Sequence, residues 1–222
     1  GDPEGHTALV SALHFTGSRV YSGGMDSRIF VWDTSETSLN RAITGERWNL
    51  TEDERRGAMG RPLMLLEGHE ASVTAIQVDT LKVVSGGADC KVILWSRATG
   101  IKLRILHGHQ RSVLCLDIGP TWIVSGGQES EARIWHLPDE ADPSQVMGND
   151  KKTKLALDAL KRNRDIKTRK KLASGDGFEL EAGPGLTVAK FGALELIGGL
   201  ADGHVVVWWL QDCKILQKVK AH

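Results

Sequence analysis

Histidine, serine and an acid recur in this sequence with fixed spacing, and these side chains could form the nucleophilic triad of a hydrolase. In each set a Gly-His pair is followed by Ser-Gly-Gly, with the serine sixteen residues after the histidine, and a tryptophan stands ten residues after that serine. The acid precedes the tryptophan by six residues. The three sets are His6, Ser22, Asp26 and Trp32; His69, Ser85, Asp89 and Trp95; and His109, Ser125, Glu129 and Trp135. A hydrolase needs one exposed nucleophile beside an oxyanion site, whereas this set recurs with an indole each time, so we predict a structural role and no enzyme.

The second set shows which elements would position these side chains. Ser72 to Val78 alternates between apolar and polar residues, and Lys82 to Ser85, Val92 to Trp95 and Leu103 to Leu106 are short runs typical of strands. Gly86 to Asp89 reads as a tight turn in which glycine supplies a positive φ. We therefore predict four short antiparallel strands for each repeat.

A four-stranded unit of about 40 residues has the period of a propeller blade. With its Gly-His and Trp positions in register, the chain resembles the WD40-repeat β-propeller family, which implies an all-β fold. In that family the serine, turn acid, histidine and indole form a hydrogen-bonded chain. The resemblance implies this network for all three sets, with Glu129 at an Asp position of the third.

Asp202 and Trp208 mark a degenerate fourth repeat, because they too are six residues apart. No Gly-His opens it, and Ile197-Gly198-Gly199 stands where the serine is expected, with one added residue before Asp202. We expect this blade to be held by packing. The predicted blades, within a partial propeller over residues 5–222, are about 5–67, 68–107, 108–181 and 182–220.

Two insertions interrupt the repeats. Trp95 and Trp135 are 40 residues apart. The interval from Trp32 to Trp95 is 63 residues, and that from Trp135 to Trp208 is 73 residues. The insertions cover about 34–62 and 137–178, and both follow a third strand, so the propeller geometry places them on one face. Trp48 in the first is either an anchor for its loop or a partner contact, and Trp122, at the start of a strand near the same face, is a second partner-binding candidate.

The second insertion carries the strongest charge pattern of the chain. Between Lys151 and Lys171 ten basic residues stand against two acids, Asp158 and Asp165: Lys151, Lys152, Lys154, Lys161, Arg162, Arg164, Lys167, Arg169, Lys170 and Lys171. The composition favours a helix. It is either a solvated or partly disordered helix or a partner-binding arm for RNA or an acidic protein surface, and no aromatic residue between the charges supports base stacking. A nuclear-localisation role for Lys161 to Lys171 is equally compatible with this composition.

Composition excludes several classes of protein. The 222 residues hold 28 basic and 28 acidic side chains and no apolar run long enough to span a membrane. Three scattered cysteines fit an intracellular place, cytoplasmic or nuclear, and no secretory signal is visible. The pair His107 and His109 lacks a third nearby ligand, so we expect no metal, no other cofactor and no small-molecule substrate.

WD40 propellers usually close with seven blades, and four blades would leave apolar sheet surfaces and edges open at both ends. Residues outside this sequence, a second chain, or an unusually tight four-bladed ring could complete the structure, and we expect unpaired edges at the terminal blades. Because propellers mostly serve as rigid platforms, we predict a noncatalytic scaffold that binds other proteins within a protein or ribonucleoprotein assembly. The alternative is the substrate-recognition module of a ubiquitin ligase.

Overall fold

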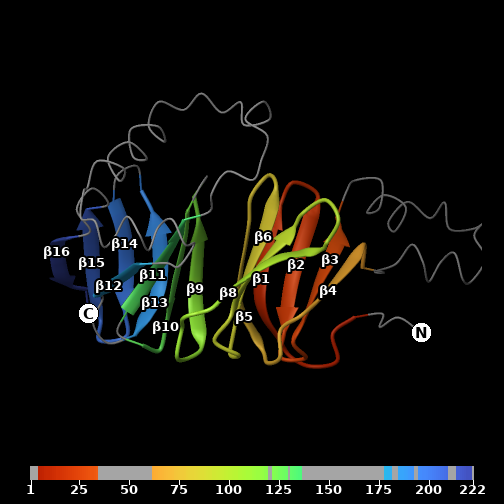
Figure 1. The fold of residues 1–222 in the computed structure, drawn as a ribbon, viewed down its shortest axis with the longest axis horizontal. Coiled ribbons are helices and arrows are strands. Elements are labelled where there is room, and N and C mark those ends of the chain that lie inside the picture. The colour runs from red at the N-terminus through yellow and green to blue at the C-terminus, as the bar shows by residue number, and fades with distance from the viewer. Residues whose placement is uncertain are drawn as a thin grey trace, which may run out of the picture. The chain divides into compact units, whose positions relative to one another are not determined.

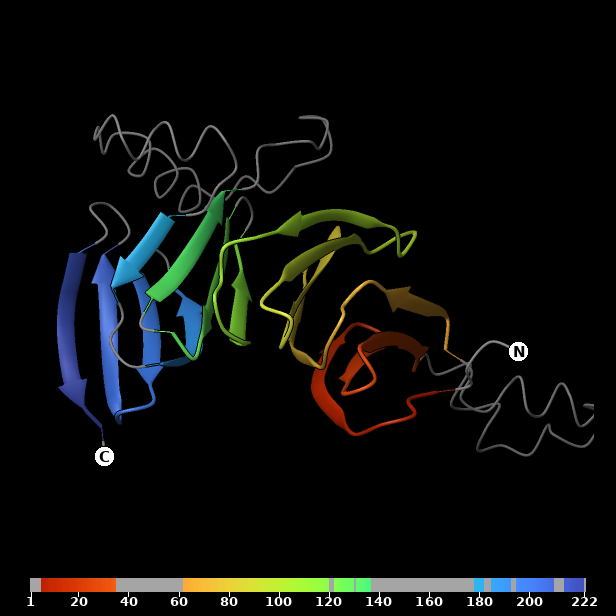
Figure 2. The same cartoon turned by 60° about the horizontal axis from the view of Figure 1, so that its bottom comes forward.

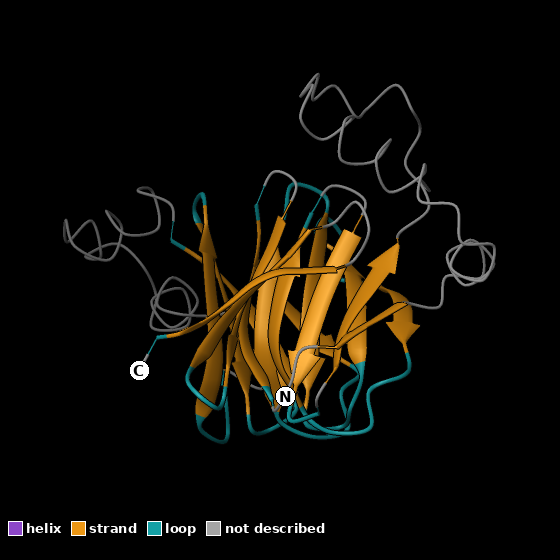
Figure 3. Cartoon of the chain, turned by 90° about the vertical axis from the view of Figure 1, so that its left-hand side faces the viewer, coloured by secondary structure: helices purple, strands orange, loops and turns teal. Residues whose placement is uncertain are grey.

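Antiparallel β-sheets make up the described part of this chain, as the sequence predicts. The computed structural model describes residues 5–34, 62–119, 122–129, 131–136, 178–181, 185–192, 195–209 and 214–221. All the regular secondary structure in these ranges is strand (Figure 3). The described ranges contain no helix of the length and hydrophobicity that crossing a bilayer requires.

Each sheet has four strands that follow one another in sequence. The first contains β1 (Val10–Thr16), β2 (Arg19–Gly24), β3 (Arg28–Asp33) and β4 (Met64–Glu67). The second contains β5 (Val73–Val78), β6 (Lys82–Gly87), β7 (Val92–Ser96) and β8 (Lys102–Leu106). The third contains β9 (Val113–Ile118), β10 (Trp122–Gly127), β11 (Glu131–His136) and β12 (Phe178–Glu181). The fourth contains β13 (Leu186–Phe191), β14 (Glu195–Leu200), β15 (His204–Trp209) and β16 (Lys214–Lys220).

The chain divides into two compact units, Gly1–Asp89 with Ile93–Ile105 and Leu106–His222 with Cys90–Val92. In Figure 1 the strands of the first two sheets run from red to yellow-green and those of the last two from green to blue. Figure 2 shows the strands of the fourth sheet lying side by side in sequence order. Each unit has its own apolar core, because a sheet has two faces and one of them must be covered by a second sheet.

In the first unit, opposite faces of two successive sheets meet. We call the face that carries the repeat tryptophan the indole face and the other the reverse face, since neighbouring residues of a strand point to opposite sides. The reverse face of the first sheet contributes Tyr21 and Val31 to one buried cluster, and the indole face of the second sheet contributes Ile76, Val83 and Trp95. The same contact recurs in the second unit.

The core of that second unit combines the reverse face of the third sheet with the indole face of the fourth. Val124 and Ile134 come from the third sheet, and Ala189, Leu196 and Trp208 from the fourth. All five side chains are at most 2% exposed. Two independent pairs of sheets therefore pack in the same way, indole face against reverse face.

The turn between the second and third strands differs from its prediction. Gly86 is still part of β6 and does not have a positive φ. The positive φ falls instead on the residue after the turn acid, which is Ser27 at 63°, Cys90 at 62° and Gly203 at 81°. In each of these three turns a single left-handed residue directly follows the acid.

Candidate functional site

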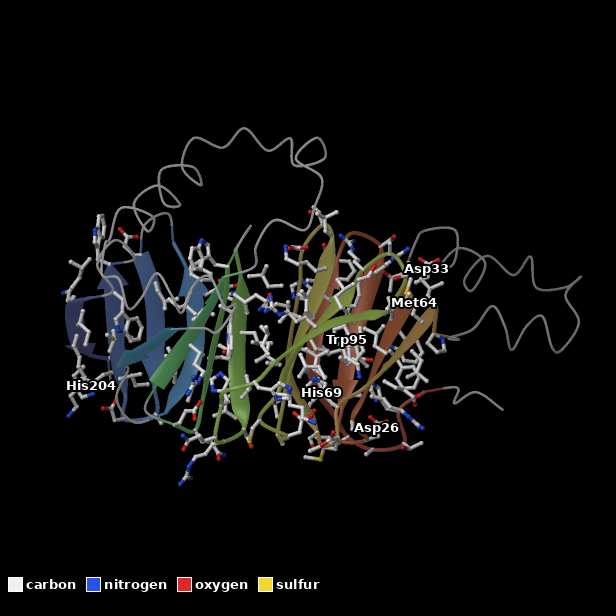
Figure 4. The ribbon with its side chains drawn as sticks, in the orientation of Figure 1. Asp26, Asp33, Met64, His69, Trp95 and His204 are labelled. Atoms are coloured by element: carbon white, nitrogen blue, oxygen red, sulfur yellow. The ribbon has the colours of Figure 1, made fainter. Side chains whose placement is uncertain are left out.

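In the second sheet, four polar side chains form one buried hydrogen-bonded chain. Trp95 Nε1 donates to Ser85 Oγ at 2.8 Å, and Ser85 Oγ lies 2.8 Å from His69 Nε2. His69 Nδ1 lies 2.9 Å from Asp89 Oδ2. Because Nδ1 faces a carboxylate it carries the ring proton, so in the neutral ring Nε2 accepts the hydroxyl proton of Ser85. Figure 4 shows His69 closer than Trp95 to the lower edge of this sheet in that view.

A glycine makes room for the histidine and the acid. A Cβ atom on Gly87 would lie 2.6 Å from His69 Nδ1 and 2.5 Å from Asp89 Oδ1. Gly24 has the same relation to His6 and to an acid in the first sheet, at 2.5 Å from each. In these two sheets the second glycine of Ser-Gly-Gly is therefore required by this close approach and not by a turn.

The first sheet holds the same set of side chains. Trp32 Nε1 donates to Ser22 Oγ at 2.7 Å, and that oxygen lies 2.9 Å from His6 Nε2. His6 Nδ1 is 3.0 Å from both carboxylate oxygens of Asp26, which Figure 4 labels near the loop end of the sheet. The structure thus brings these four predicted residues together.

Hydrogen bonds lower the pKa of Asp26. Burial by itself would raise this pKa, but the carboxylate accepts bonds from Thr7 N at 2.9 Å and Arg28 N at 3.2 Å and faces His6. These donors favour the charged form and together outweigh the burial. Asp26 therefore connects the loop before β1 to the first residue of β3.

In the third sheet the longer Glu129 side chain reaches the same partners. Its Oε1 contacts His109 Nδ1, and its Oε2 accepts from Gln110 N at 2.9 Å. Ser125 Oγ lies 2.6 Å from His109 Nε2 and accepts from Trp135 Nε1 at 2.8 Å. Burial lowers the pKa of His109 more than Glu129 raises it, so the imidazole favours its neutral form.

The strand pairing of the fourth sheet contradicts the prediction of an extra residue before Asp202. Gly198 pairs with Ala189 and Val206, as Ser22 pairs with Leu13 and Phe30, so Gly198 itself occupies the serine position. Its distance to Asp202 is four residues, which equals that from Ser22 to Asp26. The expected serine is therefore replaced by glycine, with no insertion.

Apolar packing fills the place of the polar chain in this sheet. Trp208 is 1% exposed, and Leu200, at 5%, stands where the other sheets have the second glycine. Asp202 Oδ1 accepts from His204 N at 3.1 Å and lies 3.1 Å from His204 Nδ1. A leucine fits because no histidine stands at the matching place in the sequence, where Ala182 is found.

These serines are not placed for nucleophilic attack. Ser85 and Ser125 are 0% exposed, and each hydroxyl oxygen is held between an indole and an imidazole. A nucleophile needs access to substrate and a free lone pair directed at it. Among the described residues, no group of three His, Cys, Asp or Glu side chains is arranged to hold a metal ion. The arrangement is suited to holding strands and loops together.

The predicted partner-binding residues are only partly within the described structure. Trp48 and the ten basic residues from Lys151 to Lys171 lie outside the described residues. Trp122 is the first residue of β10 and is half-buried, packing with Phe191 against the core of the second unit. Part of its ring surface therefore serves the core, and its role as a partner contact stays a prediction.

Contacts between neighbouring sheets were not predicted from the sequence. Asp117 in β9 accepts from Phe191 N at 2.8 Å and from Lys190 Nζ at 3.0 Å, both in the fourth sheet. In the first unit, Arg97 Nε donates to Tyr21 Oη at 3.2 Å. The polar Asp117 between apolar strand residues was the only available signal, and it did not identify a partner.

Comparison with known proteins agrees with this geometry. The family described as WD domain, G-beta repeat matches residues 2–33, 60–96 and 100–136. Two computationally designed proteins have similar structures. Ika8 superposes with a TM-score of 0.66 at 24% identity, over 98% of this chain and 51% of that chain. Ika4 superposes with a TM-score of 0.61 at 25% identity, over 93% of this chain and 94% of that chain.

Curated relatives match over a shorter stretch. The chain is 33% identical over 94 residues to "Ribosome biogenesis protein YTM1" of Vanderwaltozyma polyspora, which is 41% of this chain and 19% of that protein. For the proteins of the same name from Candida albicans and Kluyveromyces lactis the identities are 34% over 95 residues and 32% over 93 residues. The match thus spans about a fifth of the length of these relatives.

Proposed function

This chain belongs to the WD40-repeat β-propeller family, and from that premise we propose that it serves as a noncatalytic protein-interaction scaffold in an assembly that acts in ribosome biogenesis. The observation that carries the proposal is the sequence match to ribosome biogenesis proteins from several yeasts. Because the match covers 41% of this chain, the partners and the pathway are inferred from it.

The buried networks support a scaffold because they make rigid supports for loops. In the first three sheets a histidine and an acid connect the loop before the first strand to the turn after the second. Satisfied buried polar networks favour one arrangement of the backbone. A rigid sheet with fixed loop positions can present the same surface to a partner without reordering, which lowers the entropic cost of binding.

We propose that the basic residues from Lys151 to Lys171 contact an acidic surface of that assembly. Ten basic side chains against two acids give a strong local positive charge in a chain that is neutral overall. Ribosome assembly also favours a nuclear over a cytoplasmic place within the cell. None of the relatives named above is a ligase subunit, so the ubiquitin-ligase alternative has no support from them.

Affinity capture of the tagged chain, followed by mass spectrometry, tests the proposal. We expect ribosome biogenesis factors to be enriched, and we expect the variant with Lys161→Glu, Arg162→Glu and Arg164→Glu to lose part of them, with binding that weakens steeply in salt. Nuclease treatment before capture separates an RNA contact from a protein contact.

A matched control has the same change in charge at another place. Lys102, Arg111 and Lys220 are exposed basic residues of the described sheets and loops, and their joint change to Glu alters the net charge equally. The control should bind as the native chain does. If capture enriches no ribosome biogenesis factor, the proposal is wrong; if both variants lose partners equally, the assignment to the basic segment is wrong.

A further inference from the structure

The turn between β14 and β15 joins an acid directly to a glycine. The left-handed residue that follows the acid is Ser27 in the first sheet, Cys90 in the second and Gly203, at φ 81°, in the fourth. Glycine has no Cβ that shields its backbone nitrogen from the side chain before it. Among these three turns, Asp202-Gly203 is therefore the one in which an aspartyl carboxyl carbon most easily meets the next backbone nitrogen.

The carboxyl group of Asp202 is also less confined than its counterparts. The side chains of Asp26 and Asp89 are 5% and 4% exposed, and each lies against a histidine and a backbone N–H of a distant loop. The Asp202 side chain is 29% exposed. Within the described part of the chain its hydrogen bonds and ion pairs reach only His204 and Lys218. The carboxyl group is therefore free to turn within its own loop, and water reaches it.

The side chain of Asp202 folds back over the backbone that follows it. Its Oδ1 accepts from His204 N at 3.1 Å, which closes a turn of the kind that aspartate forms with the residue two positions on. The nitrogen of Gly203 lies between these two residues in the chain, so this turn keeps the carboxyl carbon close to it. The Gly203 N–H donates to Leu200 O at 3.1 Å, and the turn must open briefly to release it.

A proton donor stands beside the carboxyl group. His204 Nδ1 lies 3.1 Å from Asp202 Oδ1, is shielded from solvent and has no aligned hydrogen bond within the described residues. Lys218 Nζ lies 3.8 Å from the second carboxyl oxygen. Figure 4 labels His204 at the lower end of its sheet in that view. When its ring is protonated, His204 is placed to give a proton to Oδ1 as that oxygen leaves.

We propose that Asp202 is a modification site, at which the folded chain converts aspartate into isoaspartate through a cyclic imide with Gly203. The Gly203 nitrogen forms a bond to Cγ of Asp202, and the bond from Cγ to Oδ1 breaks. The oxygen leaves as water, with one proton from His204 and one from the nitrogen. Water then adds to one of the two imide carbonyl carbons: opening at Cγ restores aspartate, and opening at the backbone carbonyl carbon gives isoaspartate. The sequence of steps needs no oxidant and no reactant besides water.

Isoaspartate lengthens the backbone of this turn by one atom. The carbonyl oxygen of Gly203 accepts from Ala221 N at 2.9 Å, beside Lys220, which pairs with His204 across the sheet. The longer turn shifts these contacts, while the mass and the formal charge of the chain stay the same. One loop of the scaffold thus changes in older molecules, whether or not the chain acts in ribosome biogenesis.

Incubation of the folded chain in water enriched in heavy oxygen tests the inference, because each imide that opens takes up one heavy oxygen atom. We expect peptide mass spectrometry to find this label and isoaspartate at Asp202, and neither at Asp26 or Asp89. A synthetic peptide with the sequence of residues 199–206 is the reference, because it contains the same pair without the fold. A folded chain that stays unlabelled at Asp202 while the reference peptide is labelled would overturn the inference.

Two substitutions separate the roles of the neighbours. Gly203→Ser gives this turn the residue that the first sheet accommodates at the same place, so the variant should fold, and its Cβ should slow the labelling severalfold. His204→Gln keeps a hydrogen-bond donor but has no titrating ring, and we expect labelling at least about tenfold slower than in the native chain. His107→Gln, at an exposed histidine of another loop, is the matched control and should label at the native rate. Thermal unfolding checks the fold of each variant.

Three further results would contradict this mechanism. Native-like labelling of His204→Gln shows that the histidine gives no proton to the leaving oxygen. Native-like labelling of Gly203→Ser shows that the missing Cβ does not direct the reaction to this turn. Labelling of Asp26 or Asp89 at the rate of Asp202 shows that the turn of the fourth sheet is not distinguished from the others.

Discussion

Replacing Ser85 by alanine tests whether the buried network holds the second sheet together. The change removes the oxygen that accepts from Trp95 Nε1 and the hydroxyl that reaches His69 Nε2. Trp95 is 1% exposed and His69 is 6% exposed, so water does not replace the lost partner. Ser85→Ala therefore takes away the acceptor of the buried Trp95 indole N–H and the hydroxyl partner of His69 Nε2.

Each buried atom that loses its partner costs roughly 1–3 kcal/mol, so the two together lower the free energy of unfolding by at least roughly 2 kcal/mol. For a chain of this length that lowers Tm by roughly 4–8 °C or more. Urea unfolding followed by circular dichroism measures the first quantity, and thermal unfolding measures the second. Ser96→Ala is the matched control, because its hydroxyl accepts only an exposed bond from Thr99 N at 3.3 Å.

A double-mutant cycle with Trp95→Phe isolates the bond between the indole and the hydroxyl. Phenylalanine lacks the N–H, so removing Ser85 from that background no longer leaves a buried donor unpaired. The two single changes should then cost roughly 1–3 kcal/mol more in sum than the double change. If the free energy of unfolding of Ser85→Ala lies within roughly 0.5 kcal/mol of that of the native chain, or if the cycle is additive, the network does not stabilise the sheet.

Three further predictions follow from the same structure. Gly198→Ala should lower the free energy of unfolding by about 1–3 kcal/mol, because its Cβ would lie 2.5 Å from Leu186 and 2.7 Å from Trp208; a native-like Tm would contradict this crowding. Burial lowers the pKa of His109 below 6.5, so the unfolded chain binds more protons and the free energy of unfolding falls as pH drops below about 6.5. His109→Gln should flatten this pH dependence when unfolding is measured between about pH 7.5 and 5.5, and an unchanged slope would refute the prediction. Burial raises the pKa of Cys115 to about 12, so iodoacetamide at about pH 8 should label it only after unfolding, as peptide mass spectrometry would show; rapid labelling of the folded chain would oppose this.

The four strands of the second repeat were predictable because their signal is local. Alternation over Ser72 to Val78 became β5, and the run from Val92 to Trp95 became β7. The resemblance of this spacing to that of WD40 repeats also implied that the side chains of His69, Ser85 and Trp95 meet. Repetition separates a structural set from an active site without any coordinates.

The role of glycine was not predictable from the sequence alone. Gly86 and Gly87 read as turn residues, but both belong to β6, and Gly87 is small because a histidine and an acid lie against it. In the same way, the degenerate sequence around Gly198 suggested an added residue, whereas strand pairing shows an intact register. The type of a residue does not reveal which atoms of a distant loop will lie against it.

The sequence by itself determined the fold class, the strands of the clear repeats and the residues of their polar networks, because these depend on patterns within about 40 residues. Only the tertiary structure decided which faces of the sheets are covered. Leu13 and Ile76 are similar apolar residues at the same register position, yet one is 67% and the other 4% exposed. Burial depends on whether another sheet lies against that position, and the sequence of a repeat does not record its neighbours.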